Sequence, residues 1–262
     1  MSIDQYSWAT SPIKMLFRET PLGDGTCFFY KKNGKCYLVT NWHVLSGRDV
    51  ITGQPRKSSG AVPDSISISF HVVRPIGAVL ENYLLNLNSA NGEAIWLQHS
   101  IHGQDVDIAV LELTIPSGLC VYPINEMDTA NIRAEVGINL YILGYPVRQF
   151  TGIFPVWKRG TLATEFIFPI EGKSCFLIDT ATQEGMSGSP VILRENNYID
   201  DISNQGKISM PAGKKFIGIY SGRYNSNDQQ LAQLGIVWKK ELIDEIIDSG
   251  VAGNFVLKDC PA

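Results

Sequence analysis

The segment "QEGMSGSP", residues 183–190, is the part of the sequence on which the prediction of fold and function depends most. It places two glycines, two serines and a proline directly before an apolar run, "VIL", at residues 191–193. Glycine permits backbone conformations that other residues resist, and it lets the backbone approach a ligand closely. Such a segment is either an ordinary turn or a loop that presents a serine hydroxyl and backbone N–H groups to a substrate. The rest of the sequence distinguishes these two hypotheses.

The composition is that of a globular protein rich in strands and turns. Of the 262 residues, 44% are hydrophobic, 18% are charged and 24 are glycine, which excludes a disordered or fibrous chain. The net charge of −4 at pH 7 is mild and no basic run is present. The sequence therefore predicts no nucleic-acid partner. The length allows one large domain or two small ones that share an interface.

Targeting and metal-binding signals are weak in this sequence. No apolar stretch approaches the roughly 20 residues that cross a bilayer, and residues 1–19 lack the basic start and apolar core of a signal peptide. The five cysteines are scattered, without a CxxC pair, which is typical of a reduced protein. We therefore expect a cytoplasmic location, no membrane contact, no metal and no cofactor.

Apolar and polar residues alternate with a period of two along most of the chain, which predicts short, half-buried strands. The segment "TCFFYKKNGKCYLVT" (residues 26–40) predicts a hairpin that turns at Asn33-Gly34, a dipeptide suited to tight turns. Many short strands with Gly- and Pro-rich connections favour an all-β sandwich or barrel.

Two features organise the strands. The segment from Pro116 to Ala134 has a weaker strand pattern, and we expect it to link two strand-rich halves of the chain. The segment "KKELIDEIIDSG" (residues 239–250) predicts a helix that ends at Gly250. Its apolar residues fall on one face: Leu242, Ile243, Ile246 and Ile247.

Histidine is scarce, so its positions are informative. The four histidines all precede Ser187: His43, His71, His99 and His102. A serine hydroxyl is a poor nucleophile unless a base of near-neutral pKa lies beside it and a third group orients that base. No histidine follows Ser187, which excludes the chain order of α/β-hydrolases, and the subtilisin order would have to use Asp4 or Asp24. The order His, Asp, Ser remains.

Two further segments fit that order. "CYLVTNWHVLSG" (residues 36–47) puts His43 at the end of an apolar strand, where its side chain can project into a cleft. "DVDIAVLEL" (residues 105–113) puts Asp107 directly before a buried strand, with Asp105 as the rival. Each residue alone is more often a surface or turn residue. Together, in this order and at strand ends, they predict a catalytic triad of His43, Asp107 and Ser187.

Three blocks, "TNWHV", "DVDIAVL" and "EGMSGSP", together resemble the signature segments of trypsin-like serine peptidases. "ILGYP", "FIGIYSG" and "LGIVWKKELI" are similar to supporting segments of that family, and the resemblance covers roughly residues 15–248. It implies an all-β, chymotrypsin-like fold of two packed six-stranded antiparallel β-barrels with a C-terminal α-helix. The N-terminal barrel, residues 1–118, would carry His43 and Asp107, and the C-terminal barrel, residues 119–262, would carry Ser187.

The resemblance also implies an activity, a serine endopeptidase that acts on polypeptides through an acyl-enzyme. The backbone N–H groups of Gly185 and Ser187 would form its oxyanion hole. Ala181 would lie at the base of the primary pocket, and the residues along its walls would be Ser221, Gly222, Arg223 and Gly235. An uncharged base argues against a buried Arg or Lys, so we expect cleavage after a neutral or apolar residue. Arg223 is either an exposed, solvated arginine or an attractor of acidic substrates.

Several departures from the family pattern shape the alternative. Met186 stands where secreted zymogens carry an aspartate that pairs with the freed N-terminus, and no cysteines flank His43. The chain therefore resembles intracellular, bacterial or viral-style members, whose regulation follows another route. The alternative function is a catalytically silent fold of this kind that binds peptides, or a latent effector that needs a regulatory partner protein. We expect no metal at His99 and His102, since no further Cys or His lies near them.

Overall fold

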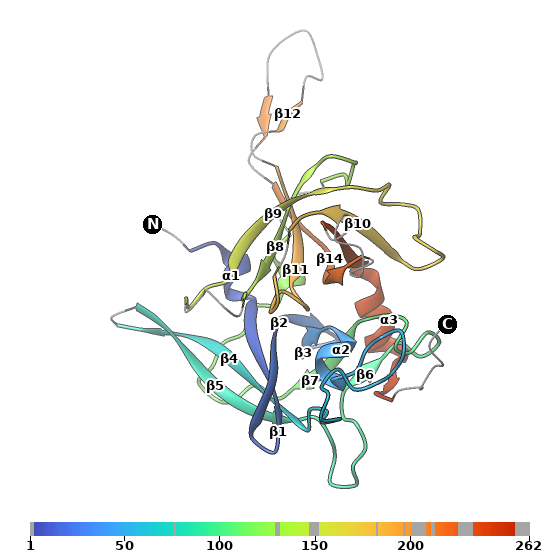
Figure 1. Ribbon diagram of the computed structural model, residues 1–262. Coiled ribbons are helices and arrows are strands. Elements are labelled where there is room, and N and C mark those ends of the chain that lie inside the picture. Colours follow the sequence, from blue (N-terminus) through green and yellow to red (C-terminus); the bar gives the residue numbers. More distant parts are fainter. Residues whose placement is uncertain are drawn as a thin grey trace.

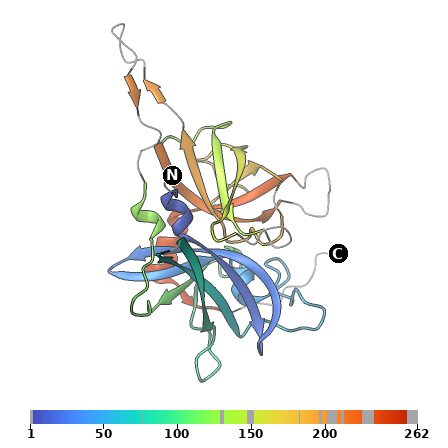
Figure 2. The same ribbon diagram turned by 90° about the vertical axis from the view of Figure 1, so that its left-hand side faces the viewer.

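Strands dominate the computed structural model, which describes residues 3–75, 77–128, 132–146, 152–181, 183–195, 198–200, 208–210, 213–224 and 233–254. Within these residues the strands form one large open sheet, one closed barrel and a separate two-stranded ribbon. The sheet and the barrel lie against each other, and the ribbon projects away from both (Figures 1 and 2). The expected all-β class is thus confirmed.

The first half of the chain builds an antiparallel sheet in the order β16-β6-β7-β3-β2-β1-β4-β5. Its strands are β1 (Thr10–Phe17), β2 (Thr20–Lys32), β3 (Lys35–Thr40), β4 (Ser65–Arg74), β5 (Gly77–Asn86), β6 (Leu97–Gln98), β7 (Ala109–Leu113) and β16 (Val251–Ala252). The sheet therefore has eight strands in the described residues, where the resemblance implied six, and the last of them comes from the C-terminal end of the chain.

The second half forms a closed barrel in the order β10-β15-β14-β11-β8-β9, which matches the expected six strands. Its strands are β8 (Asn139–Gly144), β9 (Val156–Leu162), β10 (Cys175–Asp179), β11 (Pro190–Glu195), β14 (Gly213–Arg223) and β15 (Leu234–Lys239). The ribbon consists of β12 (Tyr198–Asp200) and β13 (Ile208–Met210), between β11 and β14 in the chain.

The turn at Asn33-Gly34 is confirmed, and its geometry explains the residue choice. Asn33 and Gly34 have φ values of 51° and 77°, and tight hairpin turns between right-handed twisted strands require such positive φ values. The turn joins β2 to β3 in register, with Lys32 opposite Lys35. This hairpin supports the segment that carries His43.

Helices are short and few in the described residues: α1 (Gln5–Trp8), α2 (Trp42–Ser46), a 3₁₀ turn (Ile124–Glu126) and α3 (Glu241–Ser249). The predicted C-terminal helix is confirmed as α3, which buries Leu242, Ile243 and Ile246 and ends at Gly250. It packs back onto the first sheet, because Tyr30 on β2 donates a hydrogen bond to Asp244 (3.1 Å). No described helix is long and apolar enough to span a bilayer.

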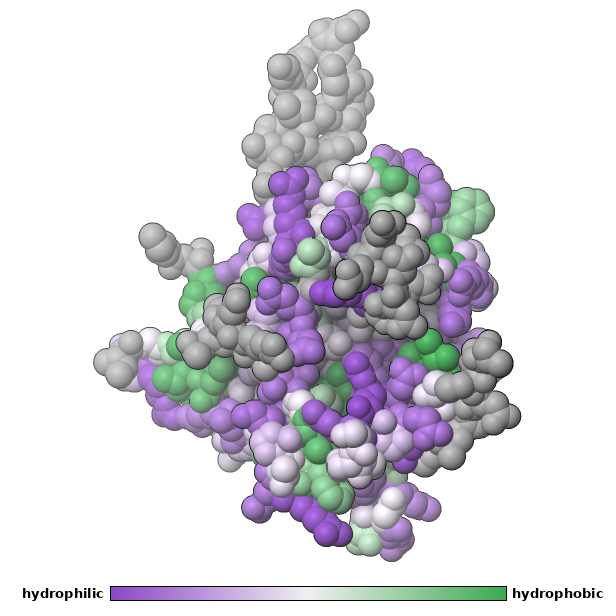
Figure 3. All heavy atoms as spheres, viewed as in Figure 1, coloured by the Kyte–Doolittle hydropathy of each residue, from purple (hydrophilic) through white to green (hydrophobic). Residues whose placement is uncertain are grey.

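Apolar side chains fill three regions: the interior of the first sheet, the interior of the barrel, and the space between them. In that space Phe28 from β2 meets Phe216 from β14, with ring centroids 5.2 Å apart. Burying a side chain of this size contributes roughly 1.5–3 kcal/mol. Outer apolar residues, in contrast, form separate patches among polar ones on the face in Figure 3. The packed space between sheet and barrel therefore fixes how the two halves meet.

Candidate active site

His43 lies in helix α2, one residue past its start, directly after strand β3. This differs from the expected strand end, because the chain turns into a short helix at Asn41. The helix ends at Gly47, whose left-handed φ of 65° lets its N–H bond the His43 carbonyl (3.1 Å). Neighbouring Trp42 donates its indole N–H to Gln98 Oε1 (2.8 Å), which also accepts from the Asn254 N–H (3.0 Å).

Strand pairing explains why Asp107 meets His43. Thr40 at the end of β3 is opposite Ala109 at the start of β7, so the residues just beyond these ends are neighbours. The Asn41 amide then donates to the Asp107 carbonyl at 2.7 Å. Asp107 is only 2% exposed, whereas its rival Asp105 is exposed. The structure therefore brings Asp107 to His43, as the sequence predicts.

The Asp107 carboxylate binds His43 through both of its oxygens. Oδ2 lies 2.8 Å from the His43 ring Nδ1, and Oδ1 accepts from the His43 backbone N–H at 2.9 Å. Burial alone would raise the pKa of this carboxyl, but the charge of His43 and the hydrogen bonds from His43 and Ser221 hold it below its ordinary value. An ionised carboxylate at Nδ1 orients the ring so that Nε2 is left as the acceptor.

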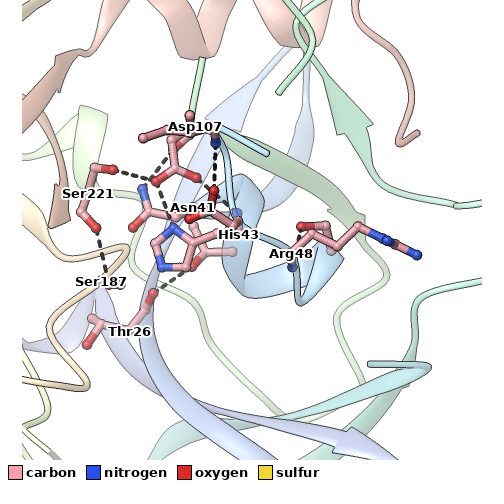
Figure 4. Close-up of polar contacts among 11 residues, drawn as sticks. Thr26, Asn41, His43, Arg48, Asp107, Ser187 and Ser221 are labelled. Carbon is pink, nitrogen blue, oxygen red and sulfur yellow. Dashed lines mark hydrogen bonds and ion pairs between the residues drawn. The ribbon is translucent and has the colours of Figure 1, made fainter. Parts of the chain in front are cut away.

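Ser187 occupies a tight turn between two glycines of positive φ, Gly185 (91°) and Gly188 (84°). Its hydroxyl donates to the Ser221 carbonyl at 3.2 Å, and the Ser221 hydroxyl donates in turn to Asp107 Oδ2. Ser221 thus links Asp107 to Ser187, and the four side chains gather in one place (Figure 4). Ser187 reaches the site from the barrel, while His43 and Asp107 come from the first sheet.

Ser221 has a role that sequence reasoning missed. It was expected only on a pocket wall, yet its side chain contacts Asp107. The signal lies in strand pairing: β11, which follows Ser187, pairs with β14, with Pro190 opposite Ile219. Pairing "SPVIL" with "FIGIYSG" in that register would have placed Ser221 beside Ser187.

Backbone amides of the serine turn divide into two groups. Those of Met186, Gly188 and Ser189 donate to the carbonyls of Gln183 (3.3 Å), Tyr220 (3.0 Å) and Met186 (3.1 Å) respectively. Those of Gly185 and Ser187 donate to no acceptor among the described residues. Two N–H groups, two residues apart, are therefore left for another acceptor.

The five expected pocket residues lie at neighbouring strand ends. Arg223 on β14 is opposite Gly235 on β15, and Ala181 follows β10, which pairs with β15. Ala181 and Arg223 are exposed, while Gly235 is buried. A Cβ added to Gly235 would lie 2.6 Å from the Tyr220 ring. That ring is only 2% exposed and belongs to the apolar interior of the barrel, so Gly235 leaves room for packing inside the barrel.

The rings of His99 and His102 contact each other at an interplanar angle of 36°, with their centroids 4.9 Å apart. His99 Nε2 lies 3.2 Å from Glu245 on α3, and its Nδ1 accepts from the backbone N–H of His102 (3.2 Å). The described residues contain no group of three or more His, Cys, Asp or Glu side chains that could hold a metal ion.

Comparison with known proteins agrees with this fold. The trypsin-like peptidase domain family matches residues 25–199, well over half of the chain. No curated protein sequence matches the chain significantly. Both structural matches described next are far below 25% identity, so their likeness concerns the fold alone.

Two solved structures illustrate that likeness. A serine endoprotease from Yersinia pestis superposes with a TM-score of 0.50 at 12% identity, over 95% of this chain and 66% of its own. A thermostable serine protease, AL20, from an extremophilic microorganism gives a TM-score of 0.50 at 14% identity, over 93% and 97% of the two chains. This chain thus spans about two thirds of the Yersinia protein.

The chain belongs to the trypsin-like peptidase family. Its chymotrypsin-like arrangement, a sheet packed against a closed six-stranded barrel, agrees with that family.

Proposed function

We propose that the protein hydrolyses peptide bonds of polypeptides with Ser187 as nucleophile, His43 as general base and acid, and Asp107 as the group that orients His43. The observation that carries this proposal is the contact of the buried Asp107 carboxylate with His43 Nδ1 at 2.8 Å. It sets the ring tautomer that a serine nucleophile requires. The roles of the other residues follow from where they lie around this pair.

In the acylation step, Ser187 Oγ forms a bond to the peptide carbonyl carbon as its proton passes to His43 Nε2. The tetrahedral intermediate collapses when the C–N bond breaks and His43 gives that proton to the departing amine. Water then attacks the acyl-enzyme, loses a proton to His43, and releases the carboxylic acid as Ser187 Oγ recovers its proton. The Asp107 carboxylate stays ionised and stabilises the imidazolium throughout.

Gly185 and Ser187 supply the oxyanion hole in this proposal. Their N–H groups are the two amides of the turn with no acceptor among the described residues. Removing one such donor typically costs about 2.7–4 kcal/mol of transition-state stabilisation. The positive φ of Gly185 suits this task, because glycine lacks the Cβ that resists such a conformation.

We further propose cleavage after a neutral or apolar residue. Ala181, at the expected base of the pocket, provides no charge for an Arg or Lys side chain. Arg223 is exposed, so it would meet a substrate at the rim rather than inside.

One observation favours the second candidate, a latent protein that a partner switches on. The Ser187 hydroxyl donates to the Ser221 carbonyl (3.2 Å), so in this state it is not donated to His43. Rotation about the Ser187 Cα–Cβ bond would redirect it, and catalytic hydrogen bonds often tighten only when substrate binds. The two candidates therefore differ in what triggers that rotation.

Labelling with a fluorophosphonate probe, followed by mass spectrometry of the modified peptide, tests this proposal. Labelling at Ser187 that disappears in His43→Ala establishes a competent site. Cleavage of an internally quenched peptide library then reports the residue preferred before the scissile bond. A folded wild-type protein that neither labels nor cleaves would contradict the endopeptidase proposal and favour the latent candidate.

A further inference from the structure

Thr26 lies on β2 of the first sheet, yet its polar groups face the serine turn of the barrel. The side chain is completely buried, and Figure 4 shows it beside Ser187. Neither the order of the triad nor the signature blocks drew attention to it. Two of the hydrogen bonds of this threonine are with backbone carbonyls of the turn.

Two hydrogen bonds from Thr26 lie on either side of the Ser187 N–H, one of the two proposed oxyanion donors. Its hydroxyl donates to the Gly185 carbonyl at 2.7 Å, and its backbone N–H donates to the Ser187 carbonyl at 2.8 Å. The first carbonyl belongs to the peptide group between Gly185 and Met186, which separates the two donor peptide groups. The second belongs to the peptide group that follows Ser187.

The Thr26 hydroxyl has only one direction in which to donate. The Tyr145 backbone N–H donates to this same oxygen at 3.1 Å, so the hydroxyl proton is left for the Gly185 carbonyl. The Thr26 carbonyl is held as well, since it accepts from the Thr40 hydroxyl at 2.8 Å. A buried hydroxyl that both donates and accepts a hydrogen bond holds its partners in a fixed position.

This fixed position matters because glycine resists peptide rotation weakly. Without it, the peptide groups around Gly185 can turn, and either donor N–H can swing out of the oxyanion position. Space is also restricted here, because a Cβ at Gly188 would overlap the Thr26 carbonyl oxygen. Thr26 therefore holds the serine turn on both sides of the Ser187 donor, and its hydroxyl fixes the peptide group that directly follows the Gly185 donor.

We propose that Thr26 is a positioning residue that holds the turn 185–188 in the conformation that presents both oxyanion donors. This inference rests on the proposed function, because it assigns a task to the same site. It predicts that the Thr26 hydroxyl acts on the transition state and not on ground-state substrate binding.

The test compares Thr26→Val, which keeps the shape and removes the hydroxyl, with Thr26→Ser, which keeps the hydroxyl. Thr10→Val is the matched control, since Thr10 is equally buried and its hydroxyl also bonds a backbone carbonyl, that of Tyr6 (3.1 Å). With the best peptide from the library, we expect Thr26→Val to lower kcat by on the order of 10- to 100-fold, below the full effect of a lost donor. KM should change less than about threefold, as for an interaction made only in the transition state.

Thr26→Ser should recover most of kcat, and Thr10→Val should stay near wild type. The inference is overturned if folded Thr26→Val keeps kcat within about threefold, if both valine variants lose kcat equally, or if serine does not restore it. Thr26→Ala replaces the valine variant should that one fail to fold.

Hydrogen exchange provides a readout that does not need activity. Thr26→Val should speed amide exchange in residues 183–190, whereas Thr10→Val should not. If wild type neither labels nor cleaves, the proposed function fails, and unchanged exchange in Thr26→Val would separately overturn the positioning role.

Discussion

The Asp107 carboxylate holds both the imidazole and the backbone amide of His43, at 2.8 and 2.9 Å. One buried side chain thus fixes the ring orientation and the start of helix α2 together. The second bond anchors the helix whatever the state of the ring, so effects on chemistry and on local structure can be separated.

Replacement of Asp107 by Asn should lower kcat by about 10⁴-fold with the fold intact, because the amide favours the wrong ring tautomer. Steady-state kinetics alongside thermal unfolding check this. A loss smaller than tenfold would contradict the orienting role of Asp107.

Replacement of Ser187 or His43 by Ala should each lower kcat by on the order of 10⁶-fold, and the double variant should be no worse, because the two act as a unit. Peptide cleavage under single-turnover conditions measures this. Residual cleavage above a percent of wild type in Ser187→Ala would refute Ser187 as the nucleophile.

Ser221→Ala should lower kcat about tenfold, while the fluorophosphonate probe should still label Ser187. The variant loses the hydroxyl that bonds Asp107, and a hydrogen bond to a charged group is worth about 1.5–3 kcal/mol. The carbonyl that accepts from Ser187 remains. An unchanged kcat would show that this hydroxyl is only structural.

Gly188→Ala should destabilise the fold and abolish activity, because the added Cβ would overlap the Thr26 carbonyl at a φ of 84°. Gly60→Ala is the control, since Gly60 has a similar φ of 75° but nothing within 4 Å of the added atom. The control should lose only the stability that a left-handed alanine costs through backbone strain, about 1–2 kcal/mol. Thermal unfolding of both variants measures the difference, and equal losses would contradict the steric argument.

His71 should make the protein less stable in mild acid. Burial lowers the pKa of this imidazole, although the hydrogen bond between its Nε2 and the Ile153 carbonyl (3.0 Å) opposes the shift. The ring also stacks on Phe154 and lies 3.5 Å from the Tyr145 hydroxyl.

A folded-state pKa below the unfolded value of about 6.5 means that the unfolded chain binds the proton first. Stability from His71 is therefore present above that value and is lost as pH falls toward the folded-state pKa. Unfolding temperatures measured between pH 7.5 and 5 should fall less steeply in His71→Phe. Equal slopes in the two proteins would contradict the assignment.

Local signals in the sequence predicted much of this architecture. Asn33-Gly34 specified the hairpin, the apolar face of residues 242–247 specified α3, and the order of His43, Asp107 and Ser187 indicated the family. The catalytic roles of these three residues stay predictions until they are tested. These features depend on residues close together in the chain or on a pattern of residue types.

Features that depend on distant pairing escaped sequence reasoning. The eight-stranded first sheet needs β16 to pair with β6, and a two-residue strand carries no periodicity. The turn of His43 into helix α2 and the hydrogen bond of Thr26 to Gly185 arise from contacts across the sheet and barrel. Such contacts are set by register, which alternation alone does not specify.

The indole of Trp42 and the backbone of Asn254 share one acceptor, Gln98 Oε1. The helix that carries His43 is thus braced by a residue made more than 200 positions later. A ribosome must extend the chain as far as Asn254 before this brace can form. A nascent chain that contains only strands β1–β7 therefore already holds His43 and Asp107 but still lacks this brace.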